Sequence, residues 1–446
     1  MWETVSAFSN TAGGWIILGV KEKKSENGSE YIVNGVANPE QMEQDIVTTL
    51  RSRSKFNAPV SCKALKYTID DKNVLVFEIP LSPHRPVAIK SNGEVYVRTG
   101  SGDTLATDME VDAIVRDASF GAKSEMEVPG TGFKDIDTNS IASYRSYLRD
   151  FNRPLSFPTL NDEEFCRKLN IVLSSGRLSY GSLLMFGKRE SVLDALPNFW
   201  IDYMEVPGNS YATASQRYTY RMPEQENIWE CFQLIMHRLR NFVDAPYMEG
   251  PDIFGAEDNS QLFCLREGLV NFCAHSDYFA SAHPTIRVFD DRIVMQNPGR
   301  FILAADEFRS RILSMPRNPS IIRLFRHPKL SENAGYGIDK ISGWKKLTGK
   351  SVIFDSDMLI STVTYLLTTT KDSRRIGENN GVNGENNDEK KVLDIIRQSP
   401  SITQPLIAAQ TGFSTRKVNR LISSLRTKKK IVRIGKTKGG HWEIND

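Results

Sequence analysis

The chain has 446 residues, enough for about three domains of ordinary size, and its 40% hydrophobic and 25% charged residues are typical of globular proteins. Its longest apolar stretches, such as residues 15–20, are far shorter than the roughly 20 residues of a membrane-spanning helix, which argues against a membrane partner and predicts a cytoplasmic protein. The net charge of +3 is unevenly divided, because residues 389–446 hold 13 Lys or Arg against 4 Asp or Glu, or +9, which leaves about −6 for the rest.

Two classes of site are not expected. The five cysteines are scattered without a C-x-x-C pair, so the sequence indicates neither a disulfide framework nor a zinc site. Residues 343–351 (GWKKLTGKS) suggest a phosphate-binding P-loop, but five residues separate the glycines instead of four. A P-loop helicase is therefore not predicted.

Residues 1–118 predict a small α/β domain. A helix is followed by the Gly13-Gly14 turn and by a buried strand at residues 15–20. Another strand is expected at residues 74–79, and residues 94–101 (EVYVRTGS) would close the domain. The turn after the helix and the closing segment are the places where polar side chains could meet a ligand.

These segments resemble the Schlafen-type AlbA-like domain, which implies nucleic-acid binding. Asn10, Thr11 and Arg98 are then candidates to donate hydrogen bonds to a phosphate of DNA, since phosphate contacts position a protein on its target. The alternative is that the glycines only make the turn and Arg98 only braces a loop. Members usually begin with a strand and helix whose acidic residues hold the metal of nuclease-active relatives, whereas this chain begins in the following helix. A nuclease is therefore not favoured, and the sequence leaves open whether Met1 is the native start.

The connector at residues 119–250 predicts core packing and no chemistry. Residues 177–188 (RLSYGSLLMFGK) resemble the connector of the same proteins and are expected to form a helix and a strand.

A helix over residues 265–278 would place Glu267 and Asn271 one turn apart on a face opposite to its apolar stripe. A carboxylate and a carboxamide at this spacing suit a hydrated metal–nucleotide site, where the Asn oxygen binds Mg²⁺ and the Glu orients or deprotonates a water. The alternative is an amphipathic helix with a solvated polar face.

Two glycine turns follow. Asn297-Pro298-Gly299 ends a predicted strand at residues 292–296, and Gly335-Tyr336-Gly337 opens a predicted helix, where backbone N–H groups can approach a phosphate. In this order the pieces resemble the nucleotide-binding domain of the GHKL superfamily (gyrase, the heat-shock chaperone, histidine kinase and MutL), in the form found in RecG-like transcriptional regulators.

The resemblance implies ATP and Mg²⁺ as cofactors. Glu267 and Asn271 would fill the N-box, with Glu267 as the catalytic base and Asn271 as the metal ligand. Asn297 and Gly299 would form the first glycine box, and Gly335 and Gly337 the second. The Asp that reads the adenine amino group in the superfamily is missing from the first box, so we expect nucleotide binding rather than hydrolysis.

The end of the chain predicts a tethered winged helix. Residues 371–388 (KDSRRIGENNGVNGENND) have the composition of a flexible linker. Helices are expected at residues 389–398, at 404–410 and from Ser414 onward, followed by a β-hairpin at residues 431–444. The candidate DNA contacts lie on the third helix and the basic wing: Ser414, Thr415, Arg416, Lys417, Asn419, Arg420, Lys428, Lys436 and Lys438. A basic protein-interaction module is the alternative.

The sequence therefore predicts a multidomain α+β protein. Its parts are an AlbA-like α/β domain at residues 1–118, a connector at 119–250, a GHKL-like α/β sandwich at 251–370, a linker at 371–388 and a winged helix-turn-helix at 389–446. The predicted function is a DNA-binding transcription regulator whose conformation responds to ATP or a related nucleotide. A Schlafen-like nucleic-acid-processing or defence enzyme, a slow ATPase and a protein-binding scaffold are the alternatives, and a homodimer is left open.

Overall fold

The structure is a computed structural model with two compact units, Met1–Leu367 and Thr368–Asp446. In the first unit it describes residues 1–25, 28–100, 102–212, 214–243, 260–301, 315–331 and 337–367. In the second unit it describes residues 392–397, 399–400, 402–411, 418, 421–422, 425–426, 430–434 and 441–444.

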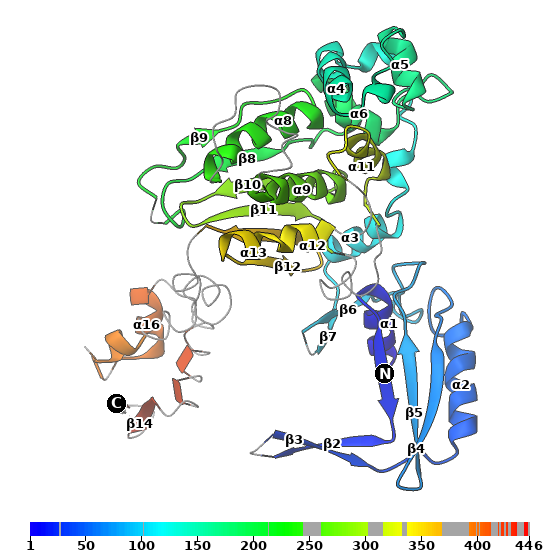
Figure 1. Cartoon of the computed structure of the whole chain (residues 1–446). Coiled ribbons are helices and arrows are strands. Elements are labelled where there is room, and N and C mark those ends of the chain that lie inside the picture. Colours follow the sequence, from blue (N-terminus) through cyan, green and yellow to red (C-terminus); the bar gives the residue numbers. More distant parts are fainter. Residues whose placement is uncertain are drawn as a thin grey trace. The chain divides into compact units, whose positions relative to one another are not determined.

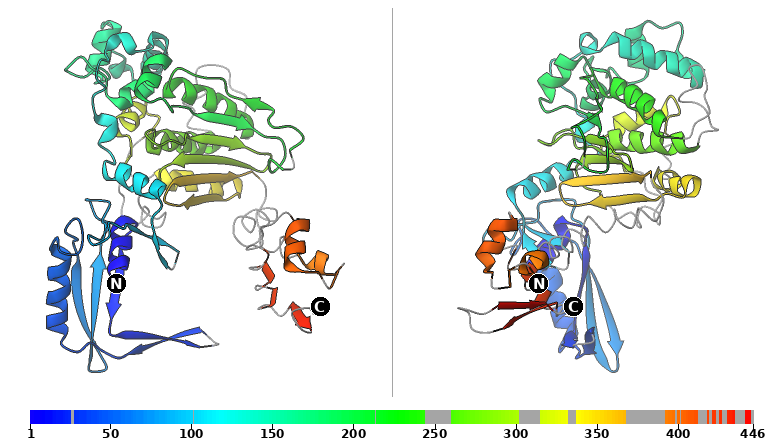
Figure 2. Two further views of the ribbon diagram at one scale, coloured as in Figure 1. Left: turned by 180° about the vertical axis from the view of Figure 1, so that it is seen from behind. Right: turned by 90° about the vertical axis from the view of Figure 1, so that its left-hand side faces the viewer.

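The N-terminal part of the first unit is a three-stranded antiparallel sheet with the order β1-β5-β4, packed against α1 and α2 (Figure 1). A hairpin of β2 and β3 extends away from this sheet in Figure 1 and in the view from behind in Figure 2. The elements are α1 (Trp2–Asn10), β1 (Gly14–Leu18), β2 (Val20–Ser25), β3 (Gly28–Val33), α2 (Pro39–Arg51), β4 (Lys63–Ile69), β5 (Lys72–Ile79), β6 (Tyr96–Thr99), β7 (Gly102–Leu105) and α3 (Asp108–Ala118).

The Gly-Gly turn positions α1 under β1. A Cβ atom on Gly14 would lie 2.6 Å from the ring of Phe8, so only glycine lets this ring pack against the strand. The single strand expected at residues 15–20 is wrong in one respect. The backbone turns at Gly19, with φ +95°, so that β1 ends at Leu18 and β2 begins at Val20.

The rest of the first unit is built on a mixed six-stranded sheet with the order β12-β13-β11-β10-β8-β9. Only β8 and β10 pair in parallel, and the other neighbours are antiparallel. The elements are α4 (Thr138–Phe151), α5 (Asp162–Lys168), α6 (Tyr180–Phe186), α7 (Arg189–Ala195), β8 (Asp202–Glu205), β9 (Tyr220–Arg221), α8 (Ile228–Leu239), α9 (Ser260–His275), β10 (Thr285–Val288), β11 (Arg292–Pro298), α11 (Pro319–Arg326), α12 (Gly337–Ser342), α13 (Trp344–Thr348), β12 (Val352–Ser356) and β13 (Ile360–Leu366).

Helices cover one face of the six-stranded sheet, and α9 is the central one among them. It lies over the sheet and packs against α8, α11, α12 and α13, and in the view from behind the sheet lies in front of these helices (Figure 2). Leu265, Leu269 and Phe272 are buried, as the sequence predicts. The helix is almost enclosed, because Glu267 on the other face is only 4% exposed.

Two local predictions need correction. Residues 180–186 form helix α6, and the strand expected in the same segment is absent among these described residues, because Leu183, Leu184 and Phe186 enter the core from a helix. Strand β11 continues through Pro298, since its last two residues pair with Ser361 and Ile360 of β13.

The second unit has its own hydrophobic core. Residues 392–397 are helical, α16 spans Gln404–Thr411, and the described positions of the predicted third helix, Val418, Leu421, Ile422 and Leu425, are buried. The strands β14 (Ile431–Ile434) and β15 (His441–Ile444) form an antiparallel hairpin. The domain boundaries within the chain otherwise stay predictions.

We predict that Gly268→Ala destabilises the first unit, although alanine favours helices by about 1 kcal/mol. An added Cβ would lie 2.1 Å from the hydroxyl of Tyr365, which donates to the carbonyl oxygen of Cys264 at 3.2 Å. The expected loss in the free energy of unfolding is about 1–3 kcal/mol in urea titrations. Tyr365→Phe removes the clashing oxygen, so the double variant should lose less than the sum of the single losses. Additive losses would contradict this account.

Candidate functional site

Glu267 and Asn271 lie together on α9, as predicted. The amide nitrogen of Asn271 donates to the backbone oxygen of Glu267 at 2.7 Å and to Glu267 Oε1 at 3.2 Å. Because the nitrogen is held in this way, the Asn271 Oδ1 oxygen is turned away from Glu267. Asn271 is half-buried, so this oxygen is the atom of the pair that is best placed to meet a ligand.

The surroundings of Glu267 are tightly packed. Helix α12 packs on α9, and the thiol of Cys264 donates to the carbonyl oxygen of Lys340 at 3.1 Å. Burial and, second, the charge of Glu267 raise the pKa of Cys264 to about 11. Burial also raises the pKa of Tyr365, with smaller effects from Cys264 and Glu267.

Asn297 stands at the end of β11 with one satisfied and one unsatisfied polar atom. Its amide nitrogen donates to the carbonyl oxygen of Phe272 on α9 at 2.9 Å. Its Oδ1 oxygen is buried and accepts no hydrogen bond from the residues that the structure describes. Buried acceptors are nearly always satisfied in native proteins, so an unpartnered one is a reason to consider a ligand.

The structure describes the first predicted glycine box and only part of the second. Gly299 has φ +91°, and a Cβ atom there would lie 2.8 Å from Nη2 of Arg317, so the first box needs glycine both for its backbone and for space. Gly337 is the first residue of α12. Gly335 lies outside the described residues.

Asn318 connects the end of α9 to the start of α11. Its amide nitrogen donates to the carbonyl oxygens of Ala274 at 3.2 Å and Ser276 at 2.8 Å. No role for Asn318 was predicted from the sequence. The signal was the Arg317-Asn318-Pro319 motif, since an Asn-Pro at a helix start often satisfies nearby backbone groups.

The predicted phosphate donors of the N-terminal part have structural partners. The Asn10 side chain is buried, donates to the carbonyl oxygens of Val87 at 3.0 Å and Tyr96 at 3.1 Å, and accepts from the Val87 N–H at 2.8 Å. The Thr11 hydroxyl accepts from the Arg98 backbone N–H at 2.9 Å. The role of Asn10 in DNA binding stays a prediction, and these bonds favour a role inside the fold instead.

Arg98 is partly engaged as well. Its guanidinium pairs with Asp103 at 2.8 Å and lies over the ring of Phe8, and its side chain is 34% exposed. This contact agrees with the alternative that Arg98 braces a loop, while its exposed part still leaves it able to reach a phosphate.

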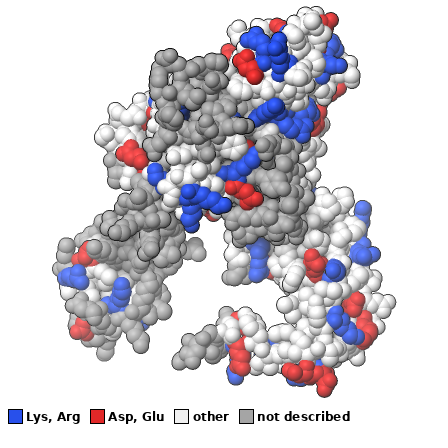
Figure 3. All heavy atoms as spheres, viewed as in Figure 1, with Lys and Arg blue, Asp and Glu red and all other residues white. Residues whose placement is uncertain are grey.

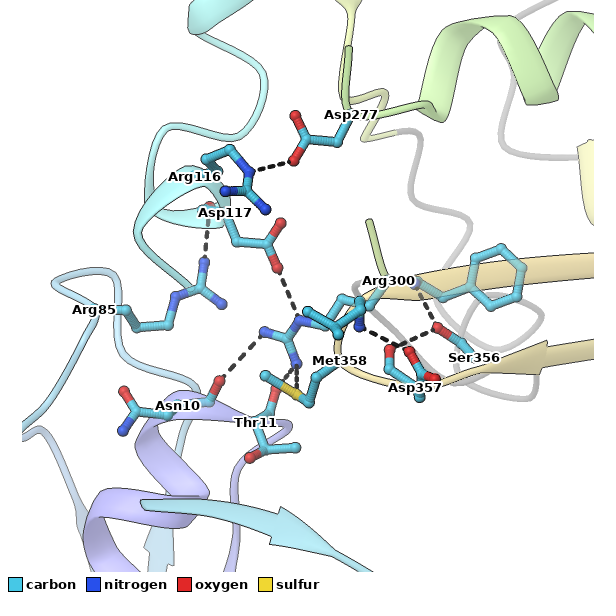
Figure 4. Close-up of polar contacts among 12 residues, drawn as sticks. Asn10, Thr11, Arg85, Arg116, Asp117, Asp277, Arg300, Ser356, Asp357 and Met358 are labelled. Atoms are coloured by element: carbon cyan, nitrogen blue, oxygen red, sulfur yellow. Dashed lines mark hydrogen bonds and ion pairs between the residues drawn. The ribbon is translucent and has the colours of Figure 1, made fainter. Parts of the chain in front are cut away.

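A buried ion-pair network that the sequence analysis missed lies between segments that are far apart in the chain (Figure 4). Arg300, which directly follows the first glycine box, pairs with Asp117 of α3 at 2.9 Å and donates to the carbonyl oxygens of Thr11 and Asn10. Arg317 pairs with the other carboxylate oxygen of Asp117 at 2.8 Å. The nearest sequence signal was the charge of Arg300 immediately after a glycine turn, and nothing local pointed to its partner.

The predicted DNA contacts of the tail cannot be placed. Ser414, Thr415, Arg416, Lys417, Asn419, Arg420, Lys428, Lys436 and Lys438 all lie outside the described residues. On the face drawn in Figure 3, the described Lys and Arg side chains are intermixed with Asp and Glu. The described residues contain no group of three or more His, Cys, Asp or Glu that could hold a metal by themselves. They also contain no helix that is long and apolar enough to cross a bilayer.

The fold and the matches to three protein-family models together define a mixed α/β protein of several domains. Residues 1–107 match the family model "Schlafen, AlbA_2", and residues 281–350 match "Putative ATP-dependent DNA helicase recG C-terminal". Between them, residues 112–202 match "Domain of unknown function (DUF8451)". The chain therefore carries an AlbA_2-type domain followed by a RecG C-terminal-like domain.

Two solved structures are similar to this chain. The DIP2311 protein from Corynebacterium diphtheriae is 14% identical, with a TM-score of 0.43, over 100% of this chain and 89% of that chain. The N-terminal domain of the "Putative ATP-dependent DNA Helicase RecG-related Protein" from Nitrosomonas europaea is 27% identical, with a TM-score of 0.20, over 24% of this chain and 73% of that chain. No curated protein matches the sequence.

We predict that the first unit loses stability as the pH falls from 6.5 to 4. Burial and, second, the charge of Arg317 lower the pKa of His275 to about 4, and burial and Arg323 lower that of His327 to about 4. The unfolded chain takes up these protons first, so each neutral histidine stabilises the fold fully above pH 6.5 and progressively less below it. The slope should approach about 1.4 kcal/mol per pH unit for His275 and be smaller for His327, which solvent screens in part.

Urea unfolding across this pH range measures the slope. His275→Gln and His327→Gln should each flatten it, whereas His84→Gln, at an exposed position, should not. Equal slopes in all three variants would contradict the prediction.

Proposed function

We propose that this protein is a DNA-binding transcription regulator whose conformation responds to ATP or a related nucleotide. The observation that supports it most is the buried, unpartnered Asn297 Oδ1 oxygen, which lies in a domain similar to the RecG C-terminal family and beside the helix of Glu267 and Asn271. The AlbA_2-type match at residues 1–107 supports a nucleic-acid partner.

Asn297 can read adenine in place of the expected Asp. The exocyclic amino group of adenine is a donor, and a single acceptor oxygen in a dry site is enough to recognise it. Guanine has a carbonyl oxygen at the equivalent position, which would face Oδ1 as a second acceptor. The Asn297 nitrogen cannot turn to compensate without losing its bond to the Phe272 carbonyl oxygen.

Asn271 would hold the magnesium ion of a bound nucleotide. The fit rests on the anchored amide nitrogen, which leaves an oxygen ligand of the kind that Mg²⁺ prefers. Mg²⁺ takes few protein ligands when nucleotide phosphates supply the others, so a single carboxamide is sufficient. When bound, the ion would neutralise phosphate charge.

Glu267 supports binding rather than turnover. Its side chain is almost fully buried, and its Oε1 oxygen accepts from the Asn271 amide. A general base has to reach a water next to the phosphate, either directly or through one water. The main role proposed for Glu267 is therefore to position Asn271, the metal ligand, and its role as a base is secondary.

The second unit fits a winged helix. Its order of helix, helix, buried apolar stripe and antiparallel hairpin is that of the fold, and it has an independent core. Residues 389–446 carry a charge of +9, which favours a polyanion over an ordinary protein surface.

We predict that the full chain binds Mg²⁺–ATP more tightly than Mg²⁺–GTP in calorimetric titrations. Asn297→Ala should reduce this preference by about tenfold, because the acceptor for the adenine amino group is lost. Asn271→Ala should remove the dependence of binding on Mg²⁺. Glu267→Gln should leave binding largely intact and abolish any residual ATP hydrolysis.

Gln296→Ala is the matched control, because side chains alternate along a strand and Gln296 faces the other side of the sheet from Asn297. Its preference for ATP should equal that of the unaltered chain. Absence of binding by either nucleotide at millimolar concentration would show that this domain has no nucleotide function.

We predict that a fragment of residues 389–446 binds duplex DNA with a steep dependence on salt. Phosphate contacts release counterions, so affinity measured by gel shift should fall sharply between low and physiological salt. Arg416→Ala with Arg420→Ala should reduce the difference in affinity between sequences more than Lys428→Ala does, since base contacts specify and phosphate contacts position. Binding that is insensitive to salt, or none at low salt, would support the protein-interaction alternative.

A further inference from the structure

Three guanidinium groups meet around one aspartate where the matched regions of the chain come together. Arg85 belongs to the AlbA_2 match, Asp117 to the following one, and Arg300 and Arg317 to the RecG C-terminal match. Figure 4 shows Arg85 and Arg300 on either side of the end of α3, which carries Asp117. We call Arg85, Arg300 and Arg317 the junction arginines.

The positive charge at this place exceeds the negative charge. Arg300 and Arg317 each take one carboxylate oxygen of Asp117, and Arg85 reaches only its backbone oxygen, at 3.0 Å. The neighbouring pair of Arg116 and Asp277, at 2.8 Å, is neutral in sum. Within the described part of the chain, three positive charges thus face the single charge of Asp117.

The junction arginines also have hydrogen-bond donors to spare. The side chains of Arg300 and Arg317 are 5% and 6% exposed. Arg317 Nε and Nη2, and Arg85 Nε and Nη1, are buried and donate to no acceptor in the described part of the chain. One face of the Arg317 guanidinium lies over the ring of Phe120, so the unpartnered nitrogens are at its edge.

The effect of this surplus is visible at Arg85. Burial and then the charge of Arg300 lower its pKa to about 10, and the carboxylate of Asp117 opposes this only in part. Proteins neutralise or pair buried charges, because an uncompensated one is costly. An anion with several acceptor oxygens would both neutralise the excess positive charge and accept hydrogen bonds from the unpartnered guanidinium nitrogens.

We propose that the junction arginines bind a small oxyanion of the phosphate class. The guanidinium group presents a planar fork of donors that matches the oxygens of a phosphoryl group, and the remaining +2 balances a dianion. The burial of Arg300 and Arg317 restricts the ligand to free phosphate or the phosphate of a nucleotide, since a duplex backbone cannot reach them. Gly299 leaves room for the Arg317 guanidinium itself, because a Cβ atom there would lie 2.8 Å from Nη2.

Calorimetric titration of the full chain with inorganic phosphate, in chloride buffer at constant ionic strength, tests the proposal. We expect saturable binding. Arg317→Gln should weaken it by about ten- to a hundredfold, because a charge-assisted donor pair is lost. Arg221→Gln removes an ion-paired arginine elsewhere in the sheet and should change nothing. If Arg317→Gln does not fold, Arg85→Gln tests the same expectation at a half-buried position.

The variant Asp117→Asn distinguishes a ligand site from a cluster that only stabilises the fold. Loss of the carboxylate raises the local charge to +3, so phosphate should bind more tightly, and phosphate should restore the thermal stability that the variant loses in chloride. A structural cluster would lose stability without this rescue. Phosphate also stabilises proteins in general by exclusion from their surface. An equal, non-saturating rise in melting temperature for all variants, or the absence of binding, overturns the proposal.

Parallel titrations with ATP and adenosine distinguish the sources of the phosphate. If the group belongs to a nucleotide, Arg317→Gln weakens ATP but not adenosine, and inorganic phosphate competes with ATP. If it is free phosphate, the two ligands bind independently. Phosphate binding in a chain that binds no ATP would remove the proposed nucleotide function and leave this site standing.

Discussion

The carboxylate of Asp117 is the point on which the arrangement of the first unit depends. It lies at the end of α3 and is shared by Arg300 and Arg317, which flank a segment of the RecG C-terminal-like region. Removing one partner of a buried pair costs about 3–5 kcal/mol, because the other charge stays behind without compensation. This interaction therefore fixes where the N-terminal part can sit against the six-stranded sheet, and apolar contacts alone would leave that orientation less defined.

The same interaction links the candidate nucleotide site to the AlbA_2-type domain. Arg300 follows Gly299 in the chain and donates to the backbone oxygens of Asn10 and Thr11 at the end of α1. Thr11 in turn accepts from the backbone of Arg98 in β6. A ligand that changes the first glycine box would act on this series of contacts, provided that it binds two arrangements of the box with different affinity. The contiguous contacts provide a route between the glycine box and the AlbA_2-type domain. The free energy of coupling comes from the difference in ligand affinity between the two arrangements.

The sequence predicted features that depend on local pattern. Helix α9, the glycine turn after β11 and the hairpin of the tail follow from apolar spacing and turn residues within short windows. The pairing of Asp117 with Arg300 joins residues 183 positions apart, and no periodicity reports on such a contact. Asn10 shows a different limit. A polar residue beside a Gly-Gly turn suits a phosphate or the backbone of its own fold equally well, and only the position of Val87 shows that the backbone takes it.

The amide of Asn297 fits the packing of β11 on α9 better than the Asp expected from the resemblance to the GHKL superfamily would. Its nitrogen joins β11 to α9 through the Phe272 carbonyl oxygen, and its oxygen has no hydrogen-bond partner in the described part of the chain. An ionised Asp has no donor, so its carboxylate would repel that carbonyl oxygen unless it moved or took up a proton. An amide meets both demands at neutral charge, with a donor for the fold and an acceptor for a base. The amide that stands in place of the expected Asp is thus the group that this packing of helix on strand requires, and in the proposed nucleotide site its oxygen would take over adenine recognition.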